Sequence, residues 1–256
     1  MSLSITILGS ASGLPSAERN DSGYILEHDG RLVLFDCGSG VRASFLKSAH
    51  NITGLEAIFI SHMHPDHISD LPVFVQMLHL ADRLEPLRIY LPEEAVKPVK
   101  KYLNACYLFD EKLSFRLEMK PIKNSVKIMN QKVLVKPVAN HHLVSNTEII
   151  EASGYPNRME SYSFLMQSGG KKMLYSADLS TLDEIENYLD DLDLLLIETT
   201  HVDIDRLPPL IRERRIKKTV LSHFSDSKQR KIREFIDSRG GAMNIIAAED
   251  NLTIKI

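Results

Sequence analysis

Three histidines and one aspartate lie within six consecutive positions of the sequence, at His62, His64, Asp66 and His67. Imidazole nitrogens and carboxylate oxygens are ligands that suit zinc, and also iron or manganese. On a tight loop His62 and His64 can face one side while Asp66 and His67 face the other, so one short segment can serve two adjacent metals. Two cations about 3.5–4 Å apart hold a hydroxide as a strong nucleophile and stabilise charge on phosphorus or carbon. The segment therefore predicts a hydrolase with two metals, in which Asp66 is both a ligand and the catalytic residue that orients the water.

Two further segments extend this motif toward the start of the chain. The His-x-His-x-Asp-His run follows an apolar stretch at residues 55–61 and resembles the signature of the metallo-β-lactamase superfamily. Residues 8–20 read Leu-Gly-Ser-x-x-Gly-x-Pro-x-x-x-Arg-Asn and residues 34–38 read Leu-Phe-Asp-Cys-Gly. Both look like the opening segments of the ribonuclease Z branch, which processes the 3′ end of transfer RNA precursors. The resemblance covers nearly the whole chain and implies an α/β fold, the four-layer αββα sandwich of the metallo-β-lactamase fold.

The resemblance also implies three more metal ligands later in the chain. A bridging aspartate is expected at Asp178, after an apolar run, and a last histidine at His223, within Leu-Ser-His-Phe-Ser. The middle histidine is ambiguous, because His141 and His142 are adjacent and neighbouring side chains on an extended loop point in opposite directions. The superfamily's histidine begins the loop just beyond a strand, which favours His142 and leaves His141 as the alternative.

The resulting assignment gives two divalent metal ions, with zinc favoured and manganese or iron as alternatives. Asp178 is the shared ligand, with water between the two metals. The two sets are His62, His64, His142 and Asp178 for one metal, and Asp66, His67, His223 and Asp178 for the other.

The sequence departs from the ribonuclease Z branch in two places. The branch carries an extended arm that grips transfer RNA between the middle histidine and the bridging aspartate, whereas residues 143–177 are too few for such an arm. The branch also has a His-Glu-x-Thr segment whose histidine helps to protonate the leaving group, and here Ile197 stands at the matching position. His201 lies close by and is an alternative general acid. The basic run at residues 212–218 is interpreted as a solvated helix face, with phosphate binding as the alternative.

Strands and helices must alternate to place these residues. Apolar strands are expected at residues 3–8 and 55–61, with a hairpin turning at Asp29-Gly30 between them. The spacing of apolar residues predicts one buried helix over 68–80, and residues 140–160 are predicted as a polar, mobile loop. The second half of the chain repeats this alternation, so each ligand falls on a loop at the end of a strand.

Composition is consistent with one folding unit over residues 1–256. The chain has 43% hydrophobic residues and a formal net charge of -3, so it lacks the excess of Lys and Arg that is typical of duplex-binding proteins. Cys37 and Cys106 form no disulfide framework, and no apolar run reaches the roughly 20 residues needed to span a bilayer. We therefore expect a cytoplasmic protein without a membrane segment, and from the resemblance a homodimer.

The leading functional prediction is a phosphodiesterase or ribonuclease Z-like hydrolase that acts on a small phosphodiester or an RNA end. A hydrolase of thioesters, lactones or lactams is the alternative within the same superfamily. A module that holds metal without catalysis is the alternative from another class, because a fold does not fix a function.

Overall fold

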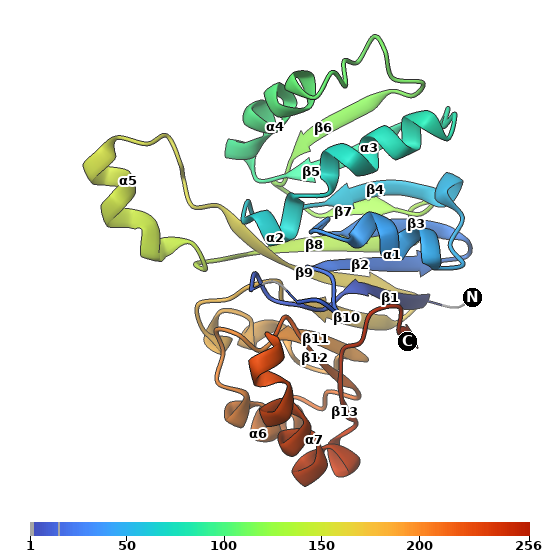
Figure 1. The fold of residues 1–256 in the computed structure, drawn as a ribbon. Helices are drawn as coiled ribbons and strands as arrows, with labels where there is room; N and C mark the ends of the chain where they lie inside the picture. The colour runs from blue at the N-terminus through green and yellow to red at the C-terminus, as the bar shows by residue number, and fades with distance from the viewer. Residues whose placement is uncertain (1–2, 15) are drawn as a thin grey trace. The chain divides into compact units, whose positions relative to one another are not determined.

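The computed structural model describes residues 3–14 and 16–256, which divide into two compact units. One unit comprises the described residues up to Lys123 together with Glu249–Lys255, and the other comprises Asn124–Ala248 and Ile256. We call them the first and the second unit (Figure 1). Within the described part of the chain, no helix combines the length and the apolar content needed to cross a bilayer.

The first unit is built on a seven-stranded sheet in the order β14-β1-β2-β3-β4-β5-β6. Its pairs are antiparallel from β14 to β3 and parallel from β3 to β6. The predicted hairpin is present, with Gly30 at φ 76° in its turn. The strands are β1 (Leu3–Gly9), β2 (Gly23–His28), β3 (Arg31–Phe35), β4 (Leu55–Phe59), β5 (Leu87–Leu91), β6 (Leu117–Pro121) and β14 (Thr253–Lys255).

Helices of the first unit cover one face of this sheet and form a continuous core with it. The helices are α1 (Val41–Lys47), η1 (Ile52–Gly54), α2 (Pro65–Ile68), α3 (Leu71–Leu80) and α4 (Glu93–Ala105). Phe45 and Phe74 meet edge to face in this core, with ring centroids 5.3 Å apart. The opposite face carries a stack of Phe35, Phe59 and Tyr90 on neighbouring strands, with centroid distances of 5.3 and 4.4 Å.

The second unit repeats the pattern with a sheet of seven strands in the order β13-β12-β11-β10-β9-β8-β7. Here β7 to β10 are antiparallel neighbours and β10 to β13 are parallel. The strands are β7 (Val126–Ile128), β8 (Val133–Asn140), β9 (Ser161–Ser168), β10 (Lys171–Tyr175), β11 (Leu194–Glu198), β12 (Thr219–Ser222) and β13 (Ile245–Ala247).

The helices of the second unit supply its own apolar core. They are η2 (Val144–Asn146), α5 (Thr147–Ser153), η3 (Leu182–Glu184), η4 (Glu186–Tyr188), η5 (Ile204–Arg206), α6 (Leu207–Glu213), η6 (Asp226–Lys228) and α7 (Gln229–Met243). Leucines and isoleucines of α6 pack with those of β10, β11 and β12. Helix α5 instead stands away from the strands of its unit (Figure 1).

Two local predictions need correction. The buried helix expected over 68–80 is present as α3, but it begins at Leu71 instead of Ile68, because Pro72 has no backbone N–H and is tolerated only in the first turn of a helix. The start of α3 is fixed by Asp70, whose backbone N–H donates to the carbonyl of Cys37 at 3.0 Å and whose side chain accepts from the N–H of Arg42 at 3.0 Å. The loop expected over 140–160 contains η2 and α5.

Candidate metal ligands in the two units

The first unit holds the dense motif on the loop between β4 and α2. Strand β1 runs in the same direction as β3 and β4, so the loops that follow all three strands lie at one edge of the sheet. The rings of His62 and His64 have centroids 4.7 Å apart, and those of His62 and His67 are 4.2 Å apart. His67 Nε2 lies 3.6 Å from Asp66 Oδ2. These distances bring the four potential ligands together in a small volume. His62 and His67 are fully buried within it.

The buried carboxylate of Asp36 holds this loop in place through contacts with Ser61 and His67. Asp36 follows β3 in a left-handed backbone conformation, with φ 58°. Its Oδ1 accepts from the backbone N–H of Ser61 at 2.7 Å, and its Oδ2 accepts from Ser61 Oγ at 2.9 Å and lies 2.8 Å from His67 Nδ1. A histidine that donates its Nδ1 proton to a carboxylate keeps the Nε2 lone pair for a metal. The structure thus favours Nε2 as the ligand atom of His67.

Backbone contacts hold the same loop in place, and two glycines allow neighbouring segments to pass close to Asp66. The N–H of Cys37 donates to the carbonyl of His67 at 2.8 Å, and a Cβ on Gly38 would stand 2.1 Å from the carbonyl oxygen of Asp66. A Cβ on Gly13 would stand 3.0 Å from Asp66 Oδ2, so the loop after β1 passes directly over that carboxylate. Cys37 itself is a buried free thiol, and burial raises its pKa well above the ordinary value. It is therefore an inert core residue.

The second unit gathers three imidazoles around one carboxylate, Asp178. Its Oδ2 lies 3.5 Å from His142 Nε2 and 4.0 Å from His201 Nδ1, and its Oδ1 lies 3.4 Å from His223 Nδ1. One ligand atom each of Asp178, His201 and His223 fall within 4.8 Å of one another. Both oxygens of Asp178 therefore face imidazole rings.

Strand direction explains this meeting of residues that are far apart in sequence. Strands β10, β11 and β12 are parallel neighbours, and β8 runs in the same direction, so the segments that follow these four strands share one edge. Ala177, which precedes Asp178, has φ 47°, and His223 itself has φ 54°. Such backbone conformations are sparsely populated by non-glycine residues and often occur at functional sites.

The adjacent histidines at the end of β8 differ sharply in environment. The His142 side chain is 7% exposed and faces Asp178, whereas the His141 side chain is 76% exposed. His141 Nδ1 lies 2.9 Å from Glu184 Oε1, and the same oxygen accepts from the backbone N–H of His141 at 2.7 Å. The other oxygen of Glu184 accepts from the N–H of Ser180 at 2.9 Å. His141 is thus engaged by Glu184, and the geometry favours His142 as the ligand.

His201 lies at the rim of the second group. Its Nδ1 is 3.4 Å from Glu198 Oε1, its side chain is 37% exposed, and the neighbouring Glu198 carboxylate raises the pKa of its imidazole. Glu198 Oε2 accepts from the backbone N–H groups of Thr200 and His201, at 2.6 and 2.9 Å. Thr200 Oγ1 in turn donates to the carbonyl of His223. The carboxylate at the end of β11 therefore shapes the turn that presents His201.

The basic run near α6 is engaged in ion pairs. Arg214 contacts Glu186 at 2.6 Å and Asp190 at 3.3 Å, and Arg215 binds Asp191 through two nitrogens at 2.7 and 2.8 Å. These arginines are balanced by acids of the same unit, which agrees with a solvated surface. The run is not a helix face, because α6 ends at Glu213.

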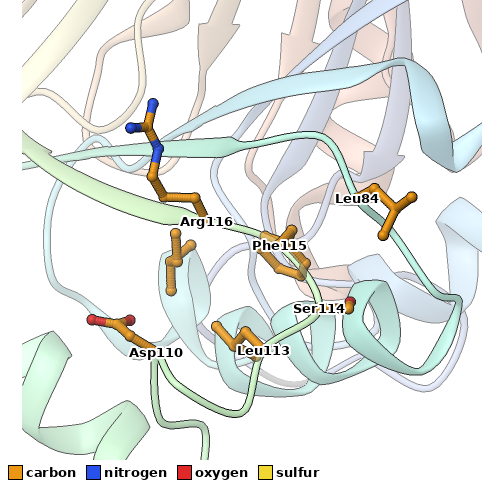
Figure 2. Close-up of a pocket in the computed structure, with 7 residues that line it drawn as sticks. Leu84, Asp110, Leu113, Ser114, Phe115 and Arg116 are labelled. Atoms are coloured by element: carbon orange, nitrogen blue, oxygen red, sulfur yellow. The ribbon is translucent and has the colours of Figure 1, made fainter.

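A pocket in the first unit lies apart from these ligands. It has a volume of about 440 Å³ and is lined by Leu84 and by residues 110 and 113–117. Figure 2 shows Leu113 and Phe115 beside it, with Asp110 and Arg116 near its margin. It contains none of the residues that the sequence singled out for chemistry.

Four supporting residues were missed as functional positions by sequence reasoning. Asp36 stands in the Leu-Phe-Asp-Cys-Gly segment at residues 34–38 and Glu198 directly follows Ile197, but neither residue type in these positions indicated a role. Glu184 is the last residue of the capping box Thr181-x-x-Glu184, a signal that was readable in advance. Asn140 directly precedes the two histidines, and only its hydrogen bonds reveal its position at the site.

The donor chemistry of both groups fits divalent metal ions. Imidazole nitrogens and carboxylate oxygens are the ligands that zinc, iron and manganese accept, and a carboxylate behind a histidine is the usual support for a metal-binding ring. We infer that the chain binds divalent metal with these groups.

Comparisons with known proteins agree with this chemistry. A family model described as Anti-Pycsar protein Apyc1 matches residues 3–250. The chain is 24% identical to ribonuclease Z from Methanosarcina acetivorans over 302 aligned positions, which cover 99% of this chain and 98% of the relative. Among solved structures it resembles the short form of human tRNase Z, with a TM-score of 0.74, 22% identity and 98% of each chain covered. It also resembles the metallo-β-lactamase fold protein YhfI from Bacillus subtilis, with a TM-score of 0.76, 17% identity and 100% of each chain covered. The predicted fold is thereby confirmed, and each unit supplies a sheet and its helices.

Proposed function

The chain belongs to the family described as Anti-Pycsar protein Apyc1, and from this membership and the two ligand groups we propose that it hydrolyses phosphodiester bonds with two bound divalent metal ions. It is a metal-dependent hydrolase with ribonuclease Z among its relatives. The observation that carries the proposal is the convergence of three imidazole rings on the Asp178 carboxylate at buried strand ends.

We assign the ligands as the sequence motifs predict them. Support comes from the distances within each unit: His67 faces Asp66 at 3.6 Å, and His142 and His223 face Asp178 at 3.5 and 3.4 Å. The first metal is assigned to His62, His64, His142 and Asp178, and the second to Asp66, His67, His223 and Asp178.

The roles of the protein groups follow from their surroundings. When bound, two divalent cations would supply a water molecule activated at neutral pH and would stabilise charge on the phosphoryl oxygens. Asp66, with an oxygen under the loop at Gly13, would orient that water. Asp36 keeps the His67 ring in one tautomer, and Glu198 holds His201 at the rim, where its raised pKa suits proton donation to a leaving oxygen.

We propose a small phosphodiester or an RNA end as the substrate. Only residues 143–177 separate His142 from Asp178, and they contain α5 and the β9–β10 hairpin. The segment therefore has no room for a large arm that would hold a folded RNA.

The finer properties are proposals of the same kind. Zinc is proposed because histidines dominate the ligand set, with manganese and iron as alternatives. A reducing, cytoplasmic location is proposed because Cys37 and Cys106 are both free thiols. A homodimer is expected from the family resemblance.

The test combines metal content with turnover. Elemental analysis of the purified protein should give about two metals per chain. The native protein should hydrolyse bis(p-nitrophenyl) phosphate, and Asp66→Ala should lose this activity. Glu148→Ala, on the exposed helix α5, is the matched control and should remain active. Turnover of ester, thioester or lactam probes without phosphodiester turnover would contradict the substrate class, and metal-loaded protein inactive on every probe would indicate a binding module.

A further inference from the structure

We propose that Asn140 is a positioning residue for the second ligand group, because its side-chain amide joins the backbones of two metal ligands. The inference rests on the proposed function, in which His142 and Asp178 bind metal. It concerns a residue that is not itself a ligand.

The geometry places Asn140 between the two ligand segments. It is the last residue of β8 and is 6% exposed. Its Nδ2 donates to the backbone carbonyl of Asp178 at 3.1 Å, and its Oδ1 accepts from the backbone N–H of His142 at 3.2 Å. One planar group therefore fixes the backbone of His142 relative to the backbone of Asp178.

A chain of buried hydrogen bonds continues from Asn140 across the sheet. Asn140 Nδ2 also donates to Ser163 Oγ at 3.2 Å, and Ser163 Oγ donates to the carbonyl of Ser176 at 2.6 Å. Ser176 Oγ accepts from the backbone N–H of Glu198 at 3.0 Å. The chain thus ties together strand ends that carry His142, Asp178 and the Glu198–His201 turn. Buried networks in which every member has a partner are rigid, so small displacements of one strand end are resisted by the others.

The amide of Asn140 satisfies partners of opposite kinds. The carbonyl of Asp178 requires a donor, and the N–H of His142 requires an acceptor, which also determines the orientation of the amide. An aspartate would place an oxygen against the Asp178 carbonyl, and a serine has one proton where the amide Nδ2 donates to both Asp178 and Ser163. Substitution of Asn140 therefore leaves both ligands in the chain but no longer fixes the backbone of His142 relative to that of Asp178.

The expected effect falls on metal affinity. Loss of a group that orients metal ligands typically weakens metal binding about 10- to 100-fold. We expect this loss for Asn140→Asp and about a tenfold loss for Asn140→Ser. The unfolding temperature of the metal-free protein should change little in comparison with the loss of metal-induced stabilisation.

The experiment measures Zn²⁺ affinity by competition with a chromophoric chelator, together with thermal unfolding of metal-free and Zn²⁺-loaded protein. Asn146→Asp is the matched control, because Asn146 lies in the same segment and donates only to the carbonyl of Leu143, at 3.0 Å. It should bind Zn²⁺ as the native chain does.

The outcomes separate the inference from the proposed function. Weaker Zn²⁺ binding and a smaller metal-induced rise in unfolding temperature for both Asn140 variants would support the inference. Native-like affinity in a folded Asn140→Asp or Asn140→Ser chain would overturn it, as would a lowered unfolding temperature without Zn²⁺ but an undiminished rise with it. If the native chain itself binds no Zn²⁺, Mn²⁺ or Fe²⁺, the proposed function fails instead.

Discussion

The two groups of candidate ligands differ in how the chain assembles them. In the first unit four ligands come from six consecutive residues, and Asp36 with nearby backbone groups holds their loop. In the second unit His142, Asp178 and His223 follow separate strands, and their positions depend on strand direction and on buried polar side chains such as Asn140. A compact motif can thus be anchored locally, whereas a dispersed one requires the register of a whole sheet.

The largest expected effect tests the central place of Asp178 in the dispersed group. Asp178→Ala removes the one carboxylate that faces three imidazoles, whereas His64→Ala removes one ring of the compact group. For Asp178→Ala we expect the loss of several kcal/mol of charge stabilisation at the metals. Because each 1.36 kcal/mol changes a rate about tenfold, phosphodiesterase activity should fall about 10³-fold. Steady-state turnover of both variants checks this, and an equal or larger loss for His64→Ala would break the comparison.

The next prediction concerns the local anchor of the compact group. Asp36→Asn keeps the shape of the side chain but weakens its bonds to Ser61 and His67. We expect metal affinity to fall about 10- to 100-fold. Metal titration followed by elemental analysis measures this, with Asp29→Asn in the exposed hairpin turn as the control. Unchanged affinity would show that backbone contacts alone hold the loop.

Glycines provide a third test, because they serve different purposes in the two units. A Cβ on Gly38 would overlap the carbonyl oxygen of Asp66 at 2.1 Å, whereas a Cβ on Gly169, in the β9–β10 turn, meets no atom within 4 Å. Gly38→Ala should lower the free energy of unfolding by about 3 kcal/mol or more. Gly169→Ala should cost only about 1–2 kcal/mol, for its left-handed backbone. Urea unfolding measures the free energy of unfolding of both variants. Similar losses for the two would mean that the loop of the first unit shifts easily to accommodate the added Cβ.

The smallest effect is a pH dependence in the first unit, away from the ligands. Burial lowers the pKa of His50 below its ordinary value of 6.5, and its Nε2 lies 2.9 Å from Thr6 Oγ1. The folded state then binds fewer protons than the unfolded state, so stability rises with pH through this range and is lost as pH falls below about 6.5 toward the lowered pKa. Unfolding followed between pH 5 and pH 8 should show a shallower dependence for His50→Gln. An identical profile would contradict this assignment.

The contrast between the units also explains what could be predicted from the sequence. The fold class was predictable because Leu34-Phe35-Asp36-Cys37-Gly38 and the histidine run carry local signals, and the comparisons confirm it. The role of Asn140 was not predictable, because its partners Ser163 and Asp178 are brought to it only by the sheet. The start of α3 at Leu71 was missed because apolar periodicity runs on through Ser69 and Asp70. The ligand assignment and the single domain over residues 1–256 stay predictions.

The pairing of β14 with β1 has a consequence for synthesis of the chain. Residues 249–255 return to the first unit, where Asp250 accepts from Ser10 Oγ at 2.8 Å and from the N–H of Asn20 at 2.7 Å, and Asn251 donates to the carbonyl of Ile7 at 2.6 Å. During translation β1 therefore lacks this neighbour until the whole of the second unit has left the ribosome. The loop that passes over Asp66 lacks its tether to Asp250 for the same time. Contacts that span so much of the sequence form late, so the first unit reaches its final form only after the second unit has been made.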